Sequence, residues 1–258
     1  MNTFKTLAKQ LPVIRTLVKE RDQLLTEQNQ LRQEYSQLSV DYQQTFAETI
    51  DYFLTLSNGI IHIGANEGQE RHQYAKHQLP VIWIEPIDEV FTKLEENLKE
   101  VHNQRALRYL LTDMDDKEYE FHISNNAGAS SSIFDLASHK EIWPEVGYVS
   151  TRTLRSTTLA TLIKRELIDT NSYDTLVMDT QGSELLVLKG AGNLLYQFKY
   201  VKTEAADFEV YKGCCMLNDL KEYLEQFGFA EIMRRRFAGQ PGVGDCFDVV
   251  FERVTEPA

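Results

Sequence analysis

The stretch Asn58-Gly-Ile-Ile-His-Ile-Gly-Ala-Asn-Glu-Gly-Gln-Glu70, read together with Val81-Ile-Trp-Ile-Glu85, decides the fold. One apolar run ends at Gly64 and Gly68, and a second ends at Glu85. In a doubly wound α/β sheet, a glycine turn lets backbone approach a nucleotide, and an acid after the next strand hydrogen-bonds ribose hydroxyls. The sequence therefore predicts a nucleoside-binding site. The alternative is a strand, turn and helix that bind no ligand.

The spacing of the glycines narrows the class of ligand. A dinucleotide site requires Gly-x-Gly-x-x-Gly, so that a pyrophosphate can bind the N–H groups at the start of the next helix. This turn has only Gly64 and Gly68, and Glu67 and Glu70 place negative charge where a diphosphate would lie. The pattern favours a cofactor with an amino-acid or sulfonium group. An NAD-dependent dehydrogenase or epimerase is the weaker alternative.

Composition limits the remaining classes of function. The 258 residues can form one α/β domain and an appendage, and there is no apolar run long enough for a transmembrane helix. A net charge of −12 argues against nucleic acid as the partner. Three cysteines without metal or disulfide spacing fit a reducing cytoplasm. Basic residues near the N-terminus leave room for peripheral contact with an anionic membrane surface.

The N-terminal segment has a seven-residue repeat. Leu17, Leu24, Leu31 and Leu38 occupy one position of a heptad, which predicts a coiled coil and a homo-oligomer formed through residues 13–46. A lone amphipathic helix packed on the domain is the alternative. We expect residues 1–48 to form this helix and residues 49–258 to form the globular domain.

From residue 59 onward the sequence alternates between strand and helix patterns. The predicted strands are Gly59–Ile63, Val81–Ile84, Arg105–Thr112, Glu118–Ser124, Tyr173–Met178, Tyr200–Glu204, Glu231–Phe237 and Cys246–Arg253. The predicted helices are Gly68–Gln78, Asp88–Leu98, Ser156–Leu167, Ser183–Leu195 and Leu217–Phe227. Residues 125–132 form a small polar loop, and residues 133–156 have no regular pattern.

The last two strands indicate the architecture. The connection Ala238–Asp245 is short and rich in turn residues, so it predicts a hairpin in which the final strand runs antiparallel to its neighbour. A mostly parallel sheet with an antiparallel C-terminal hairpin is the Rossmann-like arrangement of class I methyltransferases. Dehydrogenases usually continue into a second domain, for which this chain has no residues left.

A second motif follows the strand at residues 173–178. Asp179-Thr-Gln-Gly-Ser-Glu184 contains a carboxylate at the strand end, a glycine turn and an acid in the first turn of a helix. Ligands of open α/β sheets bind outside the carboxyl ends of the strands. We therefore expect Asp179, Glu85 and the glycine turn at Gly64 to meet in one crevice, with Glu204 ending the next strand in the same way.

These motifs resemble the FkbM family of S-adenosylmethionine-dependent methyltransferases over roughly residues 58–230. The resemblance lies in Ile-His-Ile-Gly-Ala-Asn-Glu-Gly, Ile-Glu-Pro, the block that begins at Asp179 with its Val-Leu-Lys-Gly-Ala, and Lys202-Thr-Glu204. It implies a class I fold and O-methylation, commonly of sugar or polyketide hydroxyls. The family often has an acid before the glycine turn, where this chain has His62. That departure leaves one contact to the amino-acid end of the cofactor open.

Several residues are candidates for binding the cofactor. Gly64, Ala65, Asn66 and Gly68 would shape the turn around the methionine moiety, and Glu85 would bind the ribose. Thr112 and Asp113 follow the third strand, where this fold touches adenine; an ordinary turn is the alternative there.

The candidates for catalysis are Asp179, His139 and Glu204. Asp179 could act as general base, bind a divalent ion or orient the cofactor, and alignment of the reactants alone is a further alternative. Asp179, Glu204 and Asp207 together could hold Mg²⁺. His139 lies in the irregular segment expected to cover the acceptor. Residues 125–132 could hydrogen-bond sugar hydroxyls or serve only as a connection.

Taken together, the sequence predicts a cytoplasmic O-methyltransferase acting on a sugar, glycan or glycolipid precursor. The competing hypothesis is a scaffold, in which the coiled coil carries a methyltransferase-like domain that binds ligand without turnover. The acceptor itself cannot be read from the sequence.

Overall fold

The computed structural model describes residues 16–17, 19–33 and 50–254. By its internal contacts the chain divides into two units, residues 1–49 and 50–258. The described residues of the first unit are helical, and Leu17, Leu24 and Leu31 are 57%, 64% and 65% exposed. Leu38 and both ends of the predicted coiled coil lie outside the described residues. The coiled coil therefore stays a prediction.

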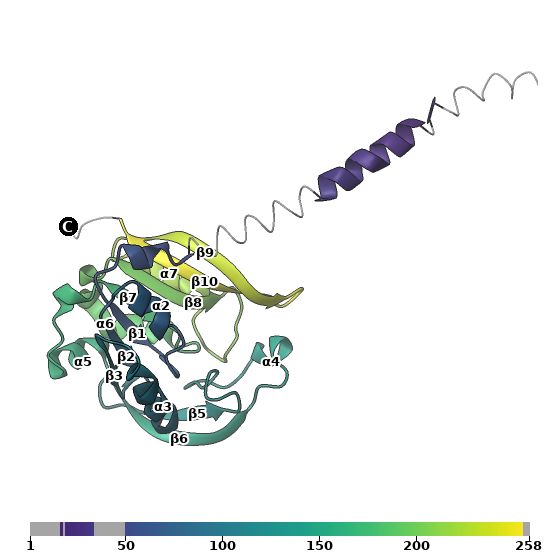
Figure 1. The fold of residues 1–258 in the computed structure, drawn as a ribbon. Coiled ribbons are helices and arrows are strands. Elements are labelled where there is room, and N and C mark those ends of the chain that lie inside the picture. The colour runs from purple at the N-terminus through teal and green to yellow at the C-terminus, as the bar shows by residue number, and fades with distance from the viewer. Residues whose placement is uncertain (1–15, 18, 34–49, 255–258) are drawn as a thin grey trace, which may run out of the picture. The chain divides into compact units, whose positions relative to one another are not determined.

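The second unit alternates strands and helices (Figure 1). Its strands are β1 (Ile60–Ile63), β2 (Val81–Ile84), β3 (Gln104–Leu107), β4 (Leu110–Leu111), β5 (Glu118–Ser124), β6 (Tyr148–Thr157), β7 (Thr175–Met178), β8 (Tyr200–Ala206), β9 (Phe229–Gln240) and β10 (Gly244–Arg253). Its α-helices are α2 (Arg71–Lys76), α3 (Asp88–Leu98), α4 (His139–Ile142), α5 (Leu159–Arg165), α6 (Glu184–Ala191) and α7 (Leu217–Glu225). Short 3-10 helices are η1 (Tyr52–Thr55), η2 (Thr170–Ser172) and η3 (Gly192–Gln197).

The main sheet has seven strands in the order β3-β2-β1-β7-β8-β10-β9. The first five are parallel, and β10 runs antiparallel to both β8 and β9. The order reverses between β1 and β7, which is the point where open α/β sheets bind ligands at their carboxyl edge. The predicted Rossmann-like class I methyltransferase fold, with its antiparallel C-terminal hairpin strand, is confirmed.

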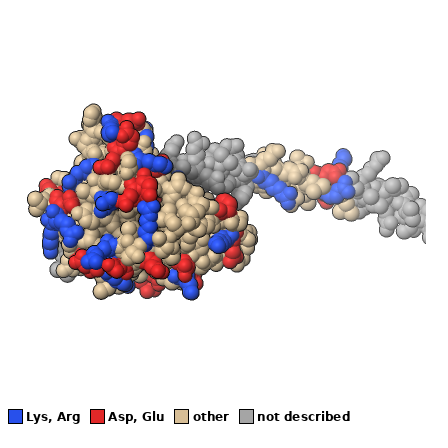
Figure 2. All heavy atoms as spheres, turned by 90° about the horizontal axis from the view of Figure 1, so that it is seen from below, with Lys and Arg blue, Asp and Glu red and all other residues tan. Residues whose placement is uncertain are grey.

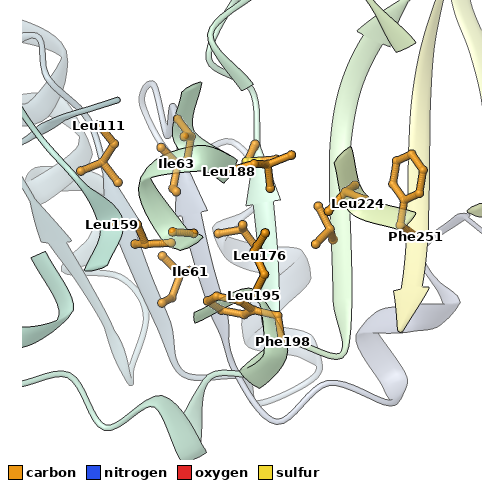
Figure 3. Close-up of a cluster of buried hydrophobic side chains, with 14 of the residues drawn as sticks. Ile61, Ile63, Leu111, Leu159, Leu176, Leu188, Leu195, Phe198, Leu224 and Phe251 are labelled. Atoms are coloured by element: carbon orange, nitrogen blue, oxygen red, sulfur yellow. The ribbon is translucent and has the colours of Figure 1, made fainter. Parts of the chain in front are cut away.

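Both faces of the sheet are covered, which explains why its central strands are continuously apolar. All residues of β1, β2 and β7 are buried. On one face, side chains of α5, α6 and α7 pack against alternate strand residues such as Ile61 and Leu176 (Figure 3). On the other face, η1, α2 and α3 cover Ile60, Trp83 and Tyr200. Two apolar cores therefore hold the strands rigidly and fix the residues at their ends.

A smaller sheet in the order β4-β6-β5 accounts for most of the departures from the predicted elements. Residues 133–156 were expected to be irregular, but they contain α4 and most of β6. The predicted strand Arg105–Thr112 breaks after Leu107, because Leu110 and Leu111 leave the main sheet to pair with β6. The predicted helix Ser156–Leu167 begins only at Leu159, since the preceding residues belong to β6.

Other differences concern element ends. The predicted helix Gly68–Gln78 is shortened to α2, and Ser183–Leu195 divides into α6 and η3. The hairpin strands extend to Gln240 and from Gly244, so the predicted eight-residue connection is mostly paired strand.

Charged side chains of both signs are interspersed on the face drawn in Figure 2, and the described residues there form no large basic patch. Within the described part of the chain, no helix is both long and apolar enough to cross a membrane.

Candidate functional site

A cavity of about 200 Å³ lies at the carboxyl ends of β1, β2, β7 and β8, and we call it the cofactor cavity. Residues of the glycine turn, Glu85 and Asp179 all line it, as the sequence predicted. Its lining includes His62, Gly64, Ala65, Asn66, Glu70, Glu85, Tyr109, Leu110, Leu111, Asp179, Thr180, Gln181, Lys202 and Glu204.

The glycine turn is packed directly against the end of β7. Gly64 has φ +80°, and a Cβ built on it would lie 1.8 Å from the carbonyl oxygen of Asp179. Any other residue would have to push β1 and β7 apart, so glycine is required here by contact as well as by conformation. The close approach brings the backbone after β1 next to Asp179.

Glu85 organises the turn as well as lining the cavity. Its Oε2 accepts a hydrogen bond from the backbone N–H of Asn66 at 3.0 Å, and its Oε1 accepts one from Ile87 at 2.9 Å. Burial raises the pKa of Glu85 to about 7, the two backbone hydrogen bonds oppose this rise, and the nearby charge of Asp179 adds to it. A buried carboxylate is thus held at the cavity wall, in the position expected of a ribose ligand.

His62 stands where the resemblance noted from the sequence implies an acid. Its ring stacks on Trp83 with centroids 4.7 Å apart, and its Nδ1 lies 3.2 Å from the hydroxyl of Tyr74. Burial lowers its pKa to about 4, so the ring is neutral at neutral pH. His62 therefore combines the role of a satisfied core histidine with a place in the cavity lining.

The turn after β7 is fixed by the acid that begins α6. Oε1 of Glu184 accepts hydrogen bonds from the backbone N–H groups of Thr180 and Gly182 at 2.9 Å and 3.2 Å. These bonds hold the segment that follows Asp179 in one conformation. The hydroxyl of Thr180 is buried and has no hydrogen-bond partner among the described residues, and it lines the cofactor cavity. It is available to a polar group of a bound ligand.

A second, larger cavity of about 610 Å³ adjoins the first, and we call it the acceptor cavity. The loop of residues 125–132 contributes Asn125, Asn126, Ala129 and Ser130 to its lining. His139, Trp143 and Tyr211 add aromatic surface. The loop of residues 125–132 and the segment that contains His139 therefore both line the acceptor cavity.

His139 is held within this aromatic surface. Its ring centroid lies 4.7 Å from that of Trp143 and 5.3 Å from that of Tyr211. The residue is 2% exposed, and burial lowers its pKa. Its Nδ1 is buried and has no hydrogen-bond partner among the described residues, so this atom could bond to a polar group of a ligand.

The two cavities meet at Asp179, Gln181 and Glu204, which line both of them together with Ala129. Burial raises the pKa values of Asp179 and Glu204; the charge of Glu184 adds to the rise at Asp179, and the charge of Asp179 adds to the rise at Glu204. Such desolvated carboxylates are stronger bases than exposed ones. The junction can therefore accept a proton from a group bound in the acceptor cavity.

Four of the predicted site residues lie elsewhere. Gly68 packs against Leu94 of α3, and Thr112 packs against α6 through its carbonyl. Asp113 receives a hydrogen bond from Tyr119, and Asp207 receives one from the backbone of residue 245. None of the four lines either cavity. The third strand brings Leu110 and Leu111 to the cofactor cavity instead, because β4 turns away before Thr112.

The predicted set of metal ligands is also dispersed. Asp179 and Glu204 meet at the junction, but Asp207 does not join them. Within residues 16–17, 19–33 and 50–254, no group of three or more His, Cys, Asp or Glu side chains is placed to hold a metal ion.

Sequence reasoning missed Gln181, Tyr211 and Lys202. Gln181 lies inside the motif that begins at Asp179, and its position just after a strand end was the available signal. Lys202 was quoted only as part of a motif, although its alternation with Glu204 on β8 places both on one face of the sheet. Tyr211 carried no signal in the sequence.

The chain is similar in sequence to known methyltransferases. The family model of the methyltransferase FkbM domain matches residues 62–230. The 2-O-methyltransferase NoeI of Sinorhizobium fredii is 25% identical over 179 residues, covering 65% of this chain and 71% of that protein.

Solved structures are also similar at low identity. The magnesium protoporphyrin IX methyltransferase of Synechocystis, with bound S-adenosylmethionine, is 11% identical with a TM-score of 0.45, covering 83% of this chain and 81% of that chain. A methyltransferase dependent on S-adenosylmethionine from Aquifex aeolicus is 14% identical with a TM-score of 0.40, covering 76% and 82%.

Proposed function

This chain belongs to the FkbM methyltransferase family, and we propose that it methylates a hydroxyl group of a sugar, glycan or glycolipid precursor. It is an S-adenosylmethionine-dependent methyltransferase. The name of its relative, a 2-O-methyltransferase, supports oxygen as the acceptor atom. The aromatic rings, amides and carboxylates of the acceptor cavity suit a sugar, which presents hydroxyls and apolar C–H faces.

The observation that carries this proposal is the junction of the two cavities. A methyltransferase must bring a methyl donor and an acceptor within reach of each other, and two adjoining cavities can do so. Asp179, Gln181 and Glu204 line both compartments here. The reacting groups would meet beside these side chains.

The cofactor cavity suits the proposed methyl donor. Glu85 would accept hydrogen bonds from the ribose hydroxyls, and Leu110 and Leu111 would contact the adenine. The hydroxyl of Thr180, which has no internal partner among the described residues, and the carboxylate of Glu70 would meet the amino-acid end. Carboxylates at this cavity attract a cationic donor and disfavour a pyrophosphate.

S-adenosylmethionine supplies a methyl group on a positively charged sulfur. The acceptor hydroxyl loses its proton as its oxygen is methylated, so the site must receive that proton. Asp179 or Glu204 would accept it at a carboxylate oxygen, because burial has raised the pKa values of both. Orientation of the reactants by the fixed strand ends would add to this effect.

We further propose that the N-terminal segment, residues 1–48, forms a homo-oligomeric coiled coil and that residues 49–258 form the methyltransferase domain. The exposed Leu17, Leu24 and Leu31 support this arrangement. The free thiols of Cys214, Cys215 and Cys246 fit a reducing cytoplasm.

A methyl-transfer assay against simple glycosides, with and without EDTA, tests the acceptor class. Calorimetry with S-adenosylhomocysteine and with NAD tests the cofactor separately. Binding of the former with transfer to a sugar hydroxyl is the expected result. Binding without transfer to any acceptor would instead favour the non-catalytic scaffold.

A further inference from the structure

The acceptor cavity is lined by acidic side chains, and no positively charged side chain among the described residues accompanies them. Asp179, Glu184 and Glu204 contribute buried or half-buried carboxyl groups, which a bound cation would ionise, and Glu145 adds a carboxylate at an exposed position. Among the described residues that line this cavity there is no lysine and no arginine. A ligand that enters therefore meets hydrogen-bond acceptors and an unfavourable potential for anions.

The cations on β8 and β9, two strands that contribute to the lining, are already paired. Lys202 lies 3.3 Å from Asp248, and Arg235 lies 2.5 Å from the same carboxylate. Arg236 pairs with Asp245 at 2.6 Å. Turning any of these side chains toward the acceptor would break an ion pair, so they are not free to bind a phosphate.

The other residues that line the acceptor cavity suit a ligand with apolar faces and hydroxyl groups. The rings of His139, Trp143 and Tyr211 provide apolar faces, and Nδ1 of His139 is buried without a partner among the described residues. Asn125 and Asn126 of the loop also line the cavity. Aromatic faces bordered by polar groups suit the C–H faces and hydroxyls of a sugar.

We propose that the acceptor is a sugar unit without negative charge, either neutral or carrying an amine, and that sugar phosphates and nucleotide sugars are rejected. This inference rests on the sugar methylation proposed above. A phosphate placed in this cavity would be desolvated next to carboxylates, whereas hydroxyl and ammonium groups donate to them. Methylation would then follow the glycosyl-transfer reaction that removes the nucleoside diphosphate from the sugar.

The direct test compares uncharged or amine-bearing glycosides with phosphorylated forms of the same sugars. Glucose, N-acetylglucosamine and glucosamine are each offered as the methyl glycoside, and the first two also as the 1-phosphate and the uridine diphosphate sugar, with S-adenosylmethionine saturating. We expect transfer to the glycosides to exceed transfer to the phosphorylated forms by at least about tenfold in kcat/KM. Equal or faster transfer to a phosphorylated form would overturn the inference and leave sugar methylation standing. Failure of every sugar, with S-adenosylhomocysteine still bound, would refute the proposed acceptor class itself.

A charge reversal at the rim gives a second measurement. Glu145→Lys places a cation in the lining, and Glu141→Lys is the matched control on an exposed residue of α4 that does not line the cavity. The first variant should raise the use of the phosphorylated sugars relative to the glycosides by about threefold or more, and the control should not. The same ratio in both variants would contradict a role for cavity charge.

A third measurement needs no acceptor. The chain has two tryptophans; Trp83 is 0% exposed, whereas Trp143 lines the acceptor cavity. At low ionic strength, caesium should quench the fluorescence of Trp143 more than iodide does, relative to neutral acrylamide. The difference should shrink in Glu145→Lys and persist in Glu141→Lys. Iodide quenching as strong as that by caesium in the native chain would overturn the negative potential on which the proposal depends.

Discussion

The side-chain amide of Gln181 donates a hydrogen bond to Oδ1 of Asp179. The carbonyl of the same amide accepts a hydrogen bond from the hydroxyl of Tyr211. The amide is therefore held from both ends, with its N–H group directed at the carboxylate that lies between the two cavities. Because the donated bond stabilises the ionised carboxylate, it opposes the rise in pKa that burial imposes on Asp179.

Replacing Gln181 with leucine should move the pH dependence of methyl transfer. The variant removes the donated hydrogen bond, so the pKa of Asp179 rises and a higher pH is needed to ionise it. We expect kcat to fall by about tenfold or more near neutral pH and to recover partly at higher pH. The measurement is the pH profile of kcat with the acceptor found in the glycoside panel.

Tyr211→Phe is the companion variant, because it frees the amide of Gln181 without removing it. It should shift the profile in the same direction by a smaller amount. A uniform loss of kcat at every pH in both variants would mean that Gln181 supports the structure and does not position the proton on Asp179.

Glu85→Gln should weaken cofactor binding. The amide would present an N–H group to one of two backbone donors, those of Asn66 and Ile87, and would leave that donor unpaired. We expect the Kd for S-adenosylhomocysteine to rise by about tenfold or more. Glu67→Gln is the control, since Glu67 pairs with Lys93 and lines neither cavity. Equal affinity in the two variants, measured by calorimetry, would remove Glu85 from the cofactor site.

The cofactor side of the site could be predicted because it depends on short-range pattern. A strand that ends in glycine or in a carboxylate can be recognised from a few consecutive residues, as at Gly64, Glu85 and Asp179. Parallel strands bring their carboxyl ends to one edge whatever lies between them. The order and direction of the strands followed from the same alternation and from the short final connection.

The acceptor side could not be predicted, because it depends on long-range pairing. Thr112 was expected near adenine, but pairing of Leu110 and Leu111 with β6 turns the chain before it. β6 itself is rich in serine, threonine and arginine and resembled a loop, although it pairs along its length with β5. Tyr211 reaches the cavity only through the fold of residues that follow β8. No short stretch of the sequence indicates any of these contacts.

Stability should decrease as the pH rises above neutrality in the ligand-free protein. The pKa of Glu85 is raised to about 7, so the folded state holds a proton that the unfolded state has already lost. The free energy of unfolding therefore falls as pH rises through that value, and the raised pKa of Glu204 extends the fall. His62 has the opposite effect on the free energy of unfolding, because its pKa is lowered from 6.5 to about 4. That effect is confined to pH values below about 6.5.

The test is the Tm measured from about pH 6.5 to about pH 8.5 at constant ionic strength. Tm should fall across this range in the native chain and fall less steeply in Glu85→Gln. The slope is compared and not the Tm at one pH, because the substitution also changes backbone hydrogen bonds. A rise in Tm over the range would contradict the assignment of buried, protonated carboxyls.

The exposed leucines of the N-terminal helix should control oligomeric state. Leu24→Glu combined with Leu31→Glu places charge on the predicted seam and should give a smaller species in light scattering. Asn29→Glu, which changes an exposed residue off that seam, should leave the mass unchanged. S-adenosylhomocysteine should bind both proteins equally, because the cavities lie in residues 50–254. Identical masses for native and variant chains would refute the coiled coil.

Binding of S-adenosylmethionine should release protons, and binding of S-adenosylhomocysteine should not. The two ligands share every group except the methyl, so they differ at the site in one positive charge. That charge would lie near Asp179 and Glu204, whose raised pKa values keep protons on them in the ligand-free site. A cation lowers these pKa values and expels the protons, and the neutral product does not.

Calorimetry at about pH 7.5 in phosphate and in Tris measures the difference, because the two buffers absorb protons with different enthalpies. Glu204→Gln removes one of the proton-holding groups and should reduce the release seen with S-adenosylmethionine, with little change for S-adenosylhomocysteine. Equal proton release with both ligands would place the sulfonium away from the junction. The same linkage predicts that loss of the positive charge on methyl transfer returns the carboxylates toward their protonated state, which favours retention of the proton taken from the acceptor.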